Sequence, residues 1–372
     1  GRIAAHLVAP RPAATTTTEL GIEIGSARDS TDAELKRLFG QHCHSEGPLA
    51  ASGGVLRLVG IDLTPALSPE QVEFLLDSLA RWRIVSIPGQ DLSKFTMDHY
   101  ERFANHWGAV VPHPNNFTRG GVSAQGKGDT DGEIEWIPFE ERTVSRSNQT
   151  FPGELQCLEH NSPAVLVTSN FGGPRDDRPT VQAGRTGGGG SWHTDIEYEP
   201  LPLYVSMFLV HTAPVDRSAP GGTWVESTGK HNYFEGSPQE LYDRRAVLPL
   251  NGETAFVDTV AAFEALPPEE QEQLASVQVR RRLNEGDEGW LAPLVRVDPR
   301  SGLRSLHSPI WASRPRVRPP IEVDGMSMED SRVFLDRLEA HCLQPEFRYD
   351  HVHRPGDVTI CARPCPSSSC FS

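Results

Sequence analysis

The sequence predicts a mainly β protein with flanking helices, folded as a double-sheet jelly roll. First, short apolar runs bounded by turn residues recur from Trp192 onward, which is typical of strands. Strands are predicted in this half of the chain at 203–211, 223–225, 277–282, 294–297, 347–353 and 358–360. Second, these strands dominate, and the few helical patterns are left to pack outside them. Together, the two observations favour a jelly roll over a parallel α/β sheet.

The amino-terminal third contains the clearest helix signals. Ser68 can cap a helix, Pro69 takes its first position and Gln71 completes a capping box. Apolar residues then recur at i, i+3, i+4 and i+7, which predicts one buried face: Val72, Leu75, Leu76 and Leu79. Two further helices are predicted, one ending at Gly108 and one beginning after Ser327. Strands are also predicted on either side of the first helix, at 56–61 and 84–87.

Three segments are expected to depart from this pattern. Residues 1–50 are predicted to be a poorly ordered N-terminal leader, because their first part is rich in alanine and threonine and lacks acidic residues. A transit peptide fits that composition less well. Residues 51–372 are then a single jelly-roll domain, with a long polar, lid-like insertion at about 115–190 and an atypical tail at 361–372. One strand is predicted inside the insertion, at 164–168.

Composition and charge narrow the range of partners. The 372 residues carry 35 basic and 50 acidic side chains, and the net charge of −15 repels nucleic acid and anionic membranes. No apolar run approaches the roughly 20 residues that a membrane span needs. The six cysteines match neither a disulfide framework nor a standard zinc site, which favours reduced thiols in the cytoplasm. We therefore expect a small-molecule substrate, no nucleic acid and no membrane, and the sequence is compatible with a homo-oligomer.

The most informative stretch is Ser191-Trp192-His193-Thr194-Asp195. Side chains on a strand repeat with period two, so His193 and Asp195 are predicted to point to one side and to share an ion. An imidazole and a carboxylate, completed by a second histidine, form the ligand set that leaves open positions on non-haem Fe(II). Alone, the motif is a weak signal, because a surface aspartate beside a half-buried histidine has the same spacing.

Four segments strengthen that signal by their order and spacing. They are Gly60-Ile61-Asp62-Leu63-Thr64, Phe103-Ala104-Asn105-His106-Trp107-Gly108, Trp192-His193-Thr194-Asp195 followed by Pro200-Leu201-Pro202, and Gly221-Gly222-Thr223-Trp224. Together they resemble the taurine dioxygenase family of Fe(II)/2-oxoglutarate-dependent enzymes, over roughly 55–113 and 191–360. The resemblance implies a double-stranded β-helix of the clavaminate synthase-like kind.

The resemblance also implies roles for individual residues. His193 and Asp195 would be the metal ligands and the catalytic centre, and Thr223 would hydrogen-bond the 2-oxoglutarate carboxylate. A β-branched strand residue is the plainer interpretation of Thr223. His113 lies one residue out of step with a substrate-contacting histidine of the family. Asn115 could line the same substrate site, although turn chemistry explains it equally well.

The implied activity is that of an Fe(II)- and 2-oxoglutarate-dependent dioxygenase. With O2 as the other co-substrate, oxidative decarboxylation of 2-oxoglutarate to succinate and CO2 would drive hydroxylation or oxidative cleavage of a small organic substrate. Family members commonly take anionic acids, sulfonates among them, so an anionic substrate is expected. The competing interpretations are a non-catalytic binding protein on the same fold and a cupin-like metal isomerase or hydrolase that does not depend on 2-oxoglutarate.

The carboxy-terminal tail departs from the family pattern. The family's third ligand is a histidine eleven positions after the aspartate of a Pro-x-Asp turn, and counting from Asp357 gives Ser368. No histidine follows His353 in the sequence. The family arginine that pairs with the far carboxylate of 2-oxoglutarate should lie beyond Ser368, and no arginine does.

Three explanations of this tail compete. The favoured one is a C-terminus that is wrong or truncated, for instance by a reading-frame error. Alternatively, His351 or His353 could serve as a substitute ligand, since the two alternate on one predicted strand. Ordinary strand residues are the plainer interpretation of both. The third explanation is a pseudoenzyme that keeps the fold and has lost the metal.

Overall fold

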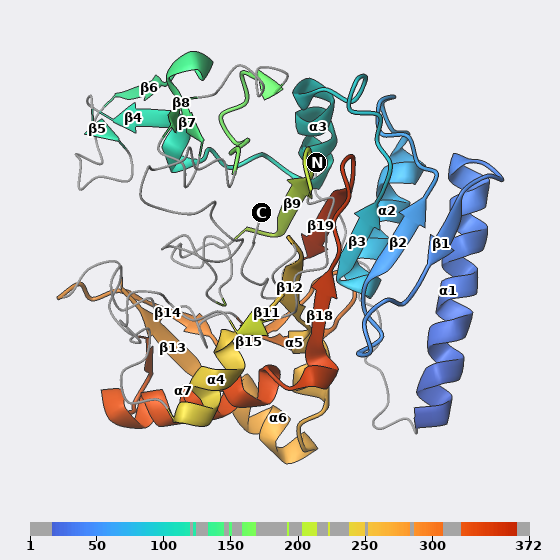
Figure 1. The fold of residues 1–372 in the computed structure, drawn as a ribbon. Coiled ribbons are helices and arrows are strands. Elements are labelled where there is room, and N and C mark those ends of the chain that lie inside the picture. The colour runs from blue at the N-terminus through green and yellow to red at the C-terminus, as the bar shows by residue number, and fades with distance from the viewer. Residues whose placement is uncertain are drawn as a thin grey trace, which may run out of the picture.

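The computed structural model describes residues 17–119, 122–123, 133–144, 149–150, 158–168, 192, 203–213, 222–223, 238–249, 252–282, 286–307 and 321–362. Within these ranges, strands gathered in several sheets form the centre, and most helices lie around them (Figure 1). This arrangement agrees with the predicted mainly β class with flanking helices.

The largest sheet has five strands, in the order β1 (His44–Glu46), β2 (Leu56–Val59), β3 (Ile84–Ile87), β19 (Val358–Ala362) and β9 (Val205–Leu209). β2 and β3 are parallel, and the other neighbours are antiparallel. β19 lies between strands from distant parts of the chain, with Val358 opposite both Ile87 and Leu209. All of β19 is buried, so it forms the middle of the amino-terminal core.

The helix α2 (Pro69–Trp82) begins as the sequence predicts. Ser68 Oγ accepts a hydrogen bond from the Gln71 N–H, and the Gln71 side chain accepts one from the Ser68 N–H. Leu75 and Leu79 of the predicted apolar face are buried in the core of the central sheet. The capping box and the apolar face therefore specify the same helix.

Residues 17–50 are ordered, which differs from the poorly ordered leader expected for residues 1–50. They form α1 (Thr17–Phe39), the edge strand β1 and the turns that follow it. Leu35 and Cys43 have no exposed surface and belong to the core of the central sheet. Burying a leucine stabilises a fold by roughly 2 kcal/mol, which offsets the polar composition of the rest of the segment.

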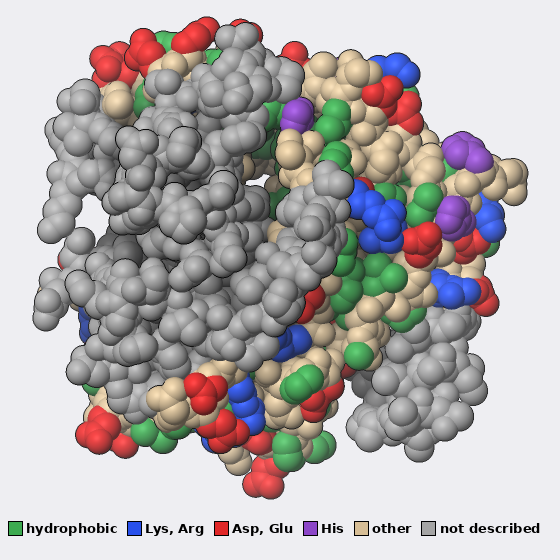
Figure 2. Space-filling view, viewed as in Figure 1, with side chains coloured by type: hydrophobic (Ala, Val, Ile, Leu, Met, Phe, Trp, Pro, Cys, Tyr) green, Lys and Arg blue, Asp and Glu red, His purple; other side chains and the backbone are tan. Residues whose placement is uncertain are grey.

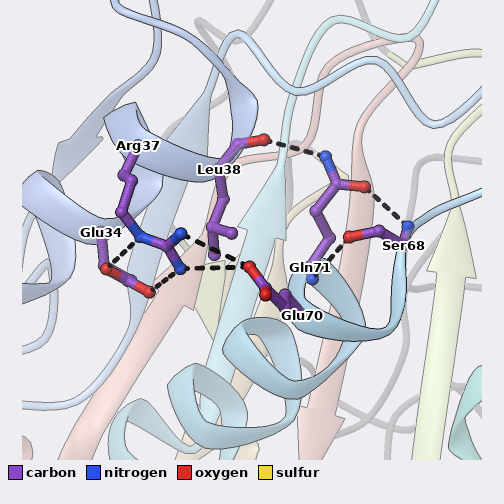
Figure 3. Close-up of polar contacts among 6 residues, drawn as sticks. All are labelled: Glu34, Arg37, Leu38, Ser68, Glu70 and Gln71. Carbon is purple, nitrogen blue, oxygen red and sulfur yellow. Dashed lines mark hydrogen bonds and ion pairs between the residues drawn. The ribbon is translucent and has the colours of Figure 1, made fainter.

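Polar contacts join the end of α1 to the first turn of α2 (Figure 3). Gln71 Nε2 donates to the Leu38 carbonyl at 3.0 Å, so one amide side chain both caps α2 and holds α1. Arg37 pairs with Glu34 on its own helix and reaches Glu70 at 3.4 Å. These ion pairs are exposed and contribute little to stability. The hydrogen bond from Gln71 therefore contributes more to holding α1 against α2.

Smaller sheets form the carboxy-terminal half. Their strands are β10 (Gly222–Thr223) with β11 (Val247–Leu248), β12 (Thr254–Val257) with β18 (Arg348–His351), β13 (Gln278–Arg281) between β14 (Trp290–Pro293) and β17 (Glu322–Val323), and β15 (Val295–Val297) with β16 (Arg304–Leu306). The helices described beside them are α4 (Gln239–Ala246), α5 (Thr259–Glu264), α6 (Pro268–Ala275) and α7 (Met328–Cys342). The predicted strands near 277–282, 294–297 and 347–353 and the helix after Ser327 are confirmed.

One largely buried ion pair connects the two halves. Arg83 follows α2, and its Nη2 lies 2.8 Å from Asp258 Oδ2. Asp258 also caps α5, because its Oδ1 accepts from the Ala261 N–H. Ser52 Oγ donates to the same carboxylate at 2.7 Å. Removing either charge would leave the other buried without its main partner, which is strongly destabilising.

The described part of the predicted lid-like insertion contains short strands: β4 (Phe117–Arg119), β5 (Val122–Ser123), β6 (Ile134–Trp136), β7 (Thr143–Val144) and β8 (Gln149–Thr150). In Figure 1 they lie at the upper left, away from α4, α6 and α7 at the bottom. The strand predicted at 164–168 is wrong, since residues 164–167 adopt no regular structure. The Val165 carbonyl instead accepts a hydrogen bond from the Asn116 side chain.

Charged side chains of both signs are interspersed over the described part of the face in Figure 2. Some of the surface charges pair across elements, as Arg300 does with Glu73 and Asp77 of α2. Among the helices that the structure describes, none combines the length and the hydropathy that crossing a membrane demands.

Replacing Gln71 by alanine should lower the free energy of unfolding by about 1–2 kcal/mol, because the hydrogen bond that joins α1 to α2 and the one that caps α2 are both lost. Urea denaturation measures the change. Glu70→Gln is the control, since it removes only an exposed ion pair and should change the free energy by less than about 0.5 kcal/mol. A larger loss in Glu70→Gln than in Gln71→Ala would contradict the importance given to the amide contact.

Candidate functional site

The two predicted metal ligands, His193 and Asp195, lie outside the described residues, as does the tail after Ala362. The residue before them, Trp192, is described and is only 3% exposed. Its ring packs in the core of the carboxy-terminal half, and the Arg348 guanidinium lies 5.2 Å from the ring centre. The chain that leads into the H-x-D motif is therefore anchored in that core.

Thr223, the predicted 2-oxoglutarate contact, lies on strand β10. Its backbone is opposite Val247 of β11, and Gly222 is opposite Leu248. Both interpretations of Thr223 place it on a strand, whether its hydroxyl is directed at a ligand or it is an ordinary β-branched strand residue. Its contact with 2-oxoglutarate therefore stays a prediction.

His113 and Asn115, the predicted substrate contacts, lie on one short turn. His113 caps the 3-10 turn η2 (Pro114–Asn116), and its Nδ1 accepts from the Asn115 N–H at 3.1 Å. The His113 N–H donates to the Pro163 carbonyl at 2.9 Å. Both residues are half-buried, and these local hydrogen bonds explain the shape of the turn. Contact with a substrate stays a prediction.

Asn116 and Arg142 hold this turn, and sequence reasoning did not single out either for that task. Asn116 is 3% exposed, and its Nδ2 donates to two carbonyls of segment 162–165. Arg142 is 6% exposed and also donates to two main-chain carbonyls. Carbonyl acceptors are present at every residue, so no sequence pattern marks an arginine that will bind them.

His351 and His353, the candidate substitute ligands, form a buried pair. His351 ends β18 and has no exposed surface, and His353 is 5% exposed. Their ring centres lie 4.6 Å apart in an edge-to-face arrangement. The two rings are thus neighbours, as alternation along one strand predicts.

Hydroxyl groups surround the ring nitrogens of this pair. His351 Nδ1 lies 3.0 Å from the Tyr349 hydroxyl, and its Nε2 lies 3.2 Å from Thr359 Oγ1. His353 Nε2 lies 2.7 Å from Thr254 Oγ1. A metal ligand must offer a nitrogen lone pair to the ion, whereas both nitrogens of His351 are engaged inside the core. The geometry therefore favours an ordinary core histidine over a substitute ligand at position 351.

Burial sets the protonation of this region. Burial, followed by the nearby charges of His353 and Arg57, lowers the pKa of His351 to about 3. Burial also raises the pKa of Tyr349 to about 12. At neutral pH the imidazole is therefore neutral and the phenol keeps its proton, so the hydrogen bonds between them need no counter-charge.

The donor set fits Fe(II) in part. Within the ranges that the structure describes, no group of three His, Cys, Asp or Glu side chains is placed to hold a metal ion. His193 and Asp195 supply an imidazole and a carboxylate, which are donors that Fe(II) accepts. Ser368 supplies no imidazole at the position expected for the third ligand.

Stability should fall as the pH drops below about 6.5, the pKa of histidine in an unfolded chain. Below that pH His351 binds a proton in the unfolded state. In the folded state, where its pKa is about 3, it stays neutral. Between these values the free energy of unfolding should decrease by up to about 1.4 kcal/mol per pH unit. Urea denaturation over this range measures the slope, which should be shallower in His351→Gln. An equal slope in that variant would assign the effect to other groups.

The family described as "Taurine catabolism dioxygenase TauD, TfdA family" matches residues 45–361. The matched range starts within the edge strand β1 and ends within the central strand β19. It therefore includes the H-x-D motif, Thr223 and the turn that carries His113.

Two curated proteins are similar to parts of the chain. Pentalenolactone F synthase from Streptomyces arenae is 27% identical over 227 residues, which is 54% of this chain and 61% of that protein. The alpha-ketoglutarate-dependent 2,4-dichlorophenoxyacetate dioxygenase of Cupriavidus pinatubonensis is 29% identical over 135 residues, which is 32% of this chain and 44% of that protein. The matching region thus spans less than two thirds of the length of either relative.

A solved structure extends the likeness to the fold. A taurine dioxygenase from Burkholderia xenovorans aligns with a TM-score of 0.51 at 20% identity, covering 89% of this chain and 83% of that one. The likeness confirms the predicted double-stranded β-helix with flanking helices. Because the family profile covers most of the sequence, the chain belongs to the TauD, TfdA family of taurine catabolism dioxygenases.

Proposed function

We propose that this protein is an Fe(II)/2-oxoglutarate-dependent dioxygenase that hydroxylates, or oxidatively cleaves, a small anionic organic substrate. The observation that carries the proposal is the family match across residues 45–361, which contains the H-x-D motif of His193 and Asp195. One relative is named for its dependence on alpha-ketoglutarate, which is another name for 2-oxoglutarate.

Each predicted site residue has a task in this proposal. His193 and Asp195 would hold Fe(II), which with 2-oxoglutarate and O2 supplies the oxidising power for attack on a C–H bond. The Thr223 hydroxyl would donate a hydrogen bond to the 2-oxoglutarate carboxylate, because a hydroxyl binds a carboxylate oxygen without adding charge. His113 and Asn115 would contact the substrate from the turn at the start of the insertion.

The geometry of His113 suits a role in anion binding. Its Nδ1 accepts from the Asn115 N–H, which in the neutral ring leaves the proton on Nε2. An Nε2–H group would donate to an oxygen of a carboxylate or sulfonate. Since the chain carries a net charge of −15, an anion must be held by such local donors rather than attracted by the protein as a whole.

An anionic substrate is also supported by the names of similar proteins. The family is named for taurine, a sulfonate, and one relative for 2,4-dichlorophenoxyacetate, a carboxylate. Both are small organic molecules that carry an anionic sulfonate or carboxylate group. The insertion at about 115–190 would cover such a substrate and keep water from the reacting atoms. Its segment 158–168 packs on Met97 of α3 (Met97–Ala104) and on Leu209 of β9, which supports a cover fixed at its base.

A second candidate function is a binding protein, or a catalytically impaired homologue, on the same fold. The observation that favours it is Ser368, which stands where the spacing from Asp357 places a third ligand. Two protein ligands would hold Fe(II) more weakly than three. A cupin-like isomerase or hydrolase would bind a metal ion without any dependence on 2-oxoglutarate.

With Fe(II), ascorbate, 2-oxoglutarate and O2, the full chain is expected to release succinate, and taurine or 2,4-dichlorophenoxyacetate as a probe substrate should increase the rate. His193→Ala and Asp195→Ala should each lower the rate by more than about 100-fold, because each removes a metal ligand. His44→Ala, at an exposed histidine of β1, is the control and should keep the rate. Absence of succinate from the unaltered chain would favour the binding protein.

Ser368→His should strengthen Mn(II) binding by about tenfold or more, because it would supply the missing imidazole. Isothermal titration with Mn(II) measures the affinity. Ser367→His and Ser369→His are matched controls, since neither stands at the spacing of eleven positions from Asp357 that the family's third ligand has, and both should leave the affinity unchanged. Equal affinities in all three variants would remove Ser368 as the reason for weak metal binding.

A further inference from the structure

Arg142 is a buried cation at the base of the insertion that the proposed function does not use. It is 6% exposed, and burial lowers its pKa. Its partners are neutral acceptors. Nε donates to the Ile137 carbonyl at 2.8 Å, Nη1 donates to the Ser162 carbonyl at 3.2 Å, and Nη1 lies 3.4 Å from His160 Nδ1. Burying a guanidinium is unfavourable unless its donors are satisfied, so these contacts must be held in place.

His160 is adapted to this contact. Burial, with a smaller effect of Arg142, lowers the pKa of His160 to about 4. The ring is therefore neutral at physiological pH, and its Nδ1 can accept, which the contact requires because arginine only donates. The Phe139 ring packs edge-on against His160 at 5.8 Å between ring centres and helps to exclude water. Arg142 thus joins residue 137 before it to segment 160–162 after it.

The same two segments hold the turn that carries His113. The Ile137 N–H donates to the Asn116 carbonyl at 3.1 Å. On the other side, Asn116 Nδ2 and the His113 N–H both donate to the Pro163 carbonyl, each at 2.9 Å. The turn is therefore held on one side by Ile137 and on the other by Pro163, which directly follows segment 160–162. Arg142 donates to Ile137 and to Ser162, so it connects the two sides.

The second of these segments is fixed to the central sheet. Leu158 is 7% exposed and packs with Met97 of α3, next to Leu209 of β9. α3 itself is tied to β9, because the Tyr100 hydroxyl donates to the Met207 carbonyl at 2.8 Å. A continuous set of contacts therefore runs from the sheet, through this segment and Arg142, to the turn.

We propose that Arg142 is a positioning residue for the turn of residues 113–116, and through the turn for the substrate contacts of His113 and Asn115. The effect on substrate rests on the proposed function, whereas the placement of the turn does not. Without the guanidinium, the carbonyls of Ile137 and Ser162 lose their common donor, and the two segments that grip the turn are no longer held at a fixed separation. The turn then samples positions from which its side chains miss the substrate.

Hydrogen exchange on the full chain, followed by mass spectrometry, tests the placement. In Arg142→Gln, the amides of His113, Asn116 and Ile137 should exchange about tenfold faster or more, because they donate within this network. The amides of β3 and β19 should keep their protection from exchange, since the central sheet does not depend on the hydrogen bonds of Arg142.

Two further variants make the result decisive. Arg244→Gln is the matched control, because Arg244 also donates to a main-chain carbonyl, that of Ala340 at 2.8 Å, but in the other half of the molecule. It should leave exchange at the turn unchanged. Arg142→Lys keeps the charge and one donor, and serves if Arg142→Gln does not fold. Unchanged exchange at the turn, in whichever Arg142 variant keeps β19 protected, would overturn the proposal.

Kinetics separate this inference from the proposed function. With 2,4-dichlorophenoxyacetate as the probe, Arg142→Gln should raise KM about fivefold or more. Succinate release without the probe should persist, because no metal or 2-oxoglutarate contact is altered. A uniform loss of both rates would indicate a merely structural role and count against positioning. If the unaltered chain releases no succinate at all, the proposed function fails. Faster exchange at the turn in Arg142→Gln would still support Arg142 as the residue that positions the turn.

Discussion

The stretch 348–362 is the constraint on which the rest of the structure depends. Its first strand, β18, pairs with β12 in the carboxy-terminal half, and its second, β19, lies between β3 and β9 in the amino-terminal half. One short piece of chain therefore pairs with strands of both halves. The contact between His351 Nε2 and Thr359 Oγ1 joins the two strands where they are buried. Because these pairings join residues far apart in sequence, the sheets that contain β12, β3 and β9 can form their full pairing only when residues 348–362 are in place.

Polar groups inside the framework follow two different rules. His351 and Tyr349 are neutral, since burial moves the pKa of each away from the range where it would be charged. Where two segments are fixed in one relative position, the buried group is a charged arginine that donates several hydrogen bonds. Arg83 meets a carboxylate between the halves, and Arg142 meets carbonyls and an imidazole at the insertion. Each guanidinium therefore fixes the relative position of its partners, because one planar group donates several hydrogen bonds in set directions.

Local sequence patterns predicted an element correctly where the residues that determine it all lie within that element. The helix α2 was predictable because its cap and its apolar face agree. The elements within residues 17–50 were not predicted, because their few apolar residues, such as Leu35, become buried only when the core of the central sheet forms. The strand predicted at 164–168 was wrong for a similar reason, since the Val165 carbonyl accepts a hydrogen bond from the Asn116 side chain, a contact that no local pattern reveals. For the site, spacing predicted His193 as a ligand candidate. It could not reveal Arg142, whose acceptors belong to the main chain.

The helix α1 precedes residue 45, where the similarity to the family begins. Yet Leu35, near its end, and Cys43, just after it, have no exposed surface and complete the packing of the central sheet. A domain boundary drawn from similarity alone would cut through that packing. The shortened chain would uncover an apolar strip of the sheet, and such strips promote self-association. For this protein, the edge of the shared region is thus not the edge of the folding unit.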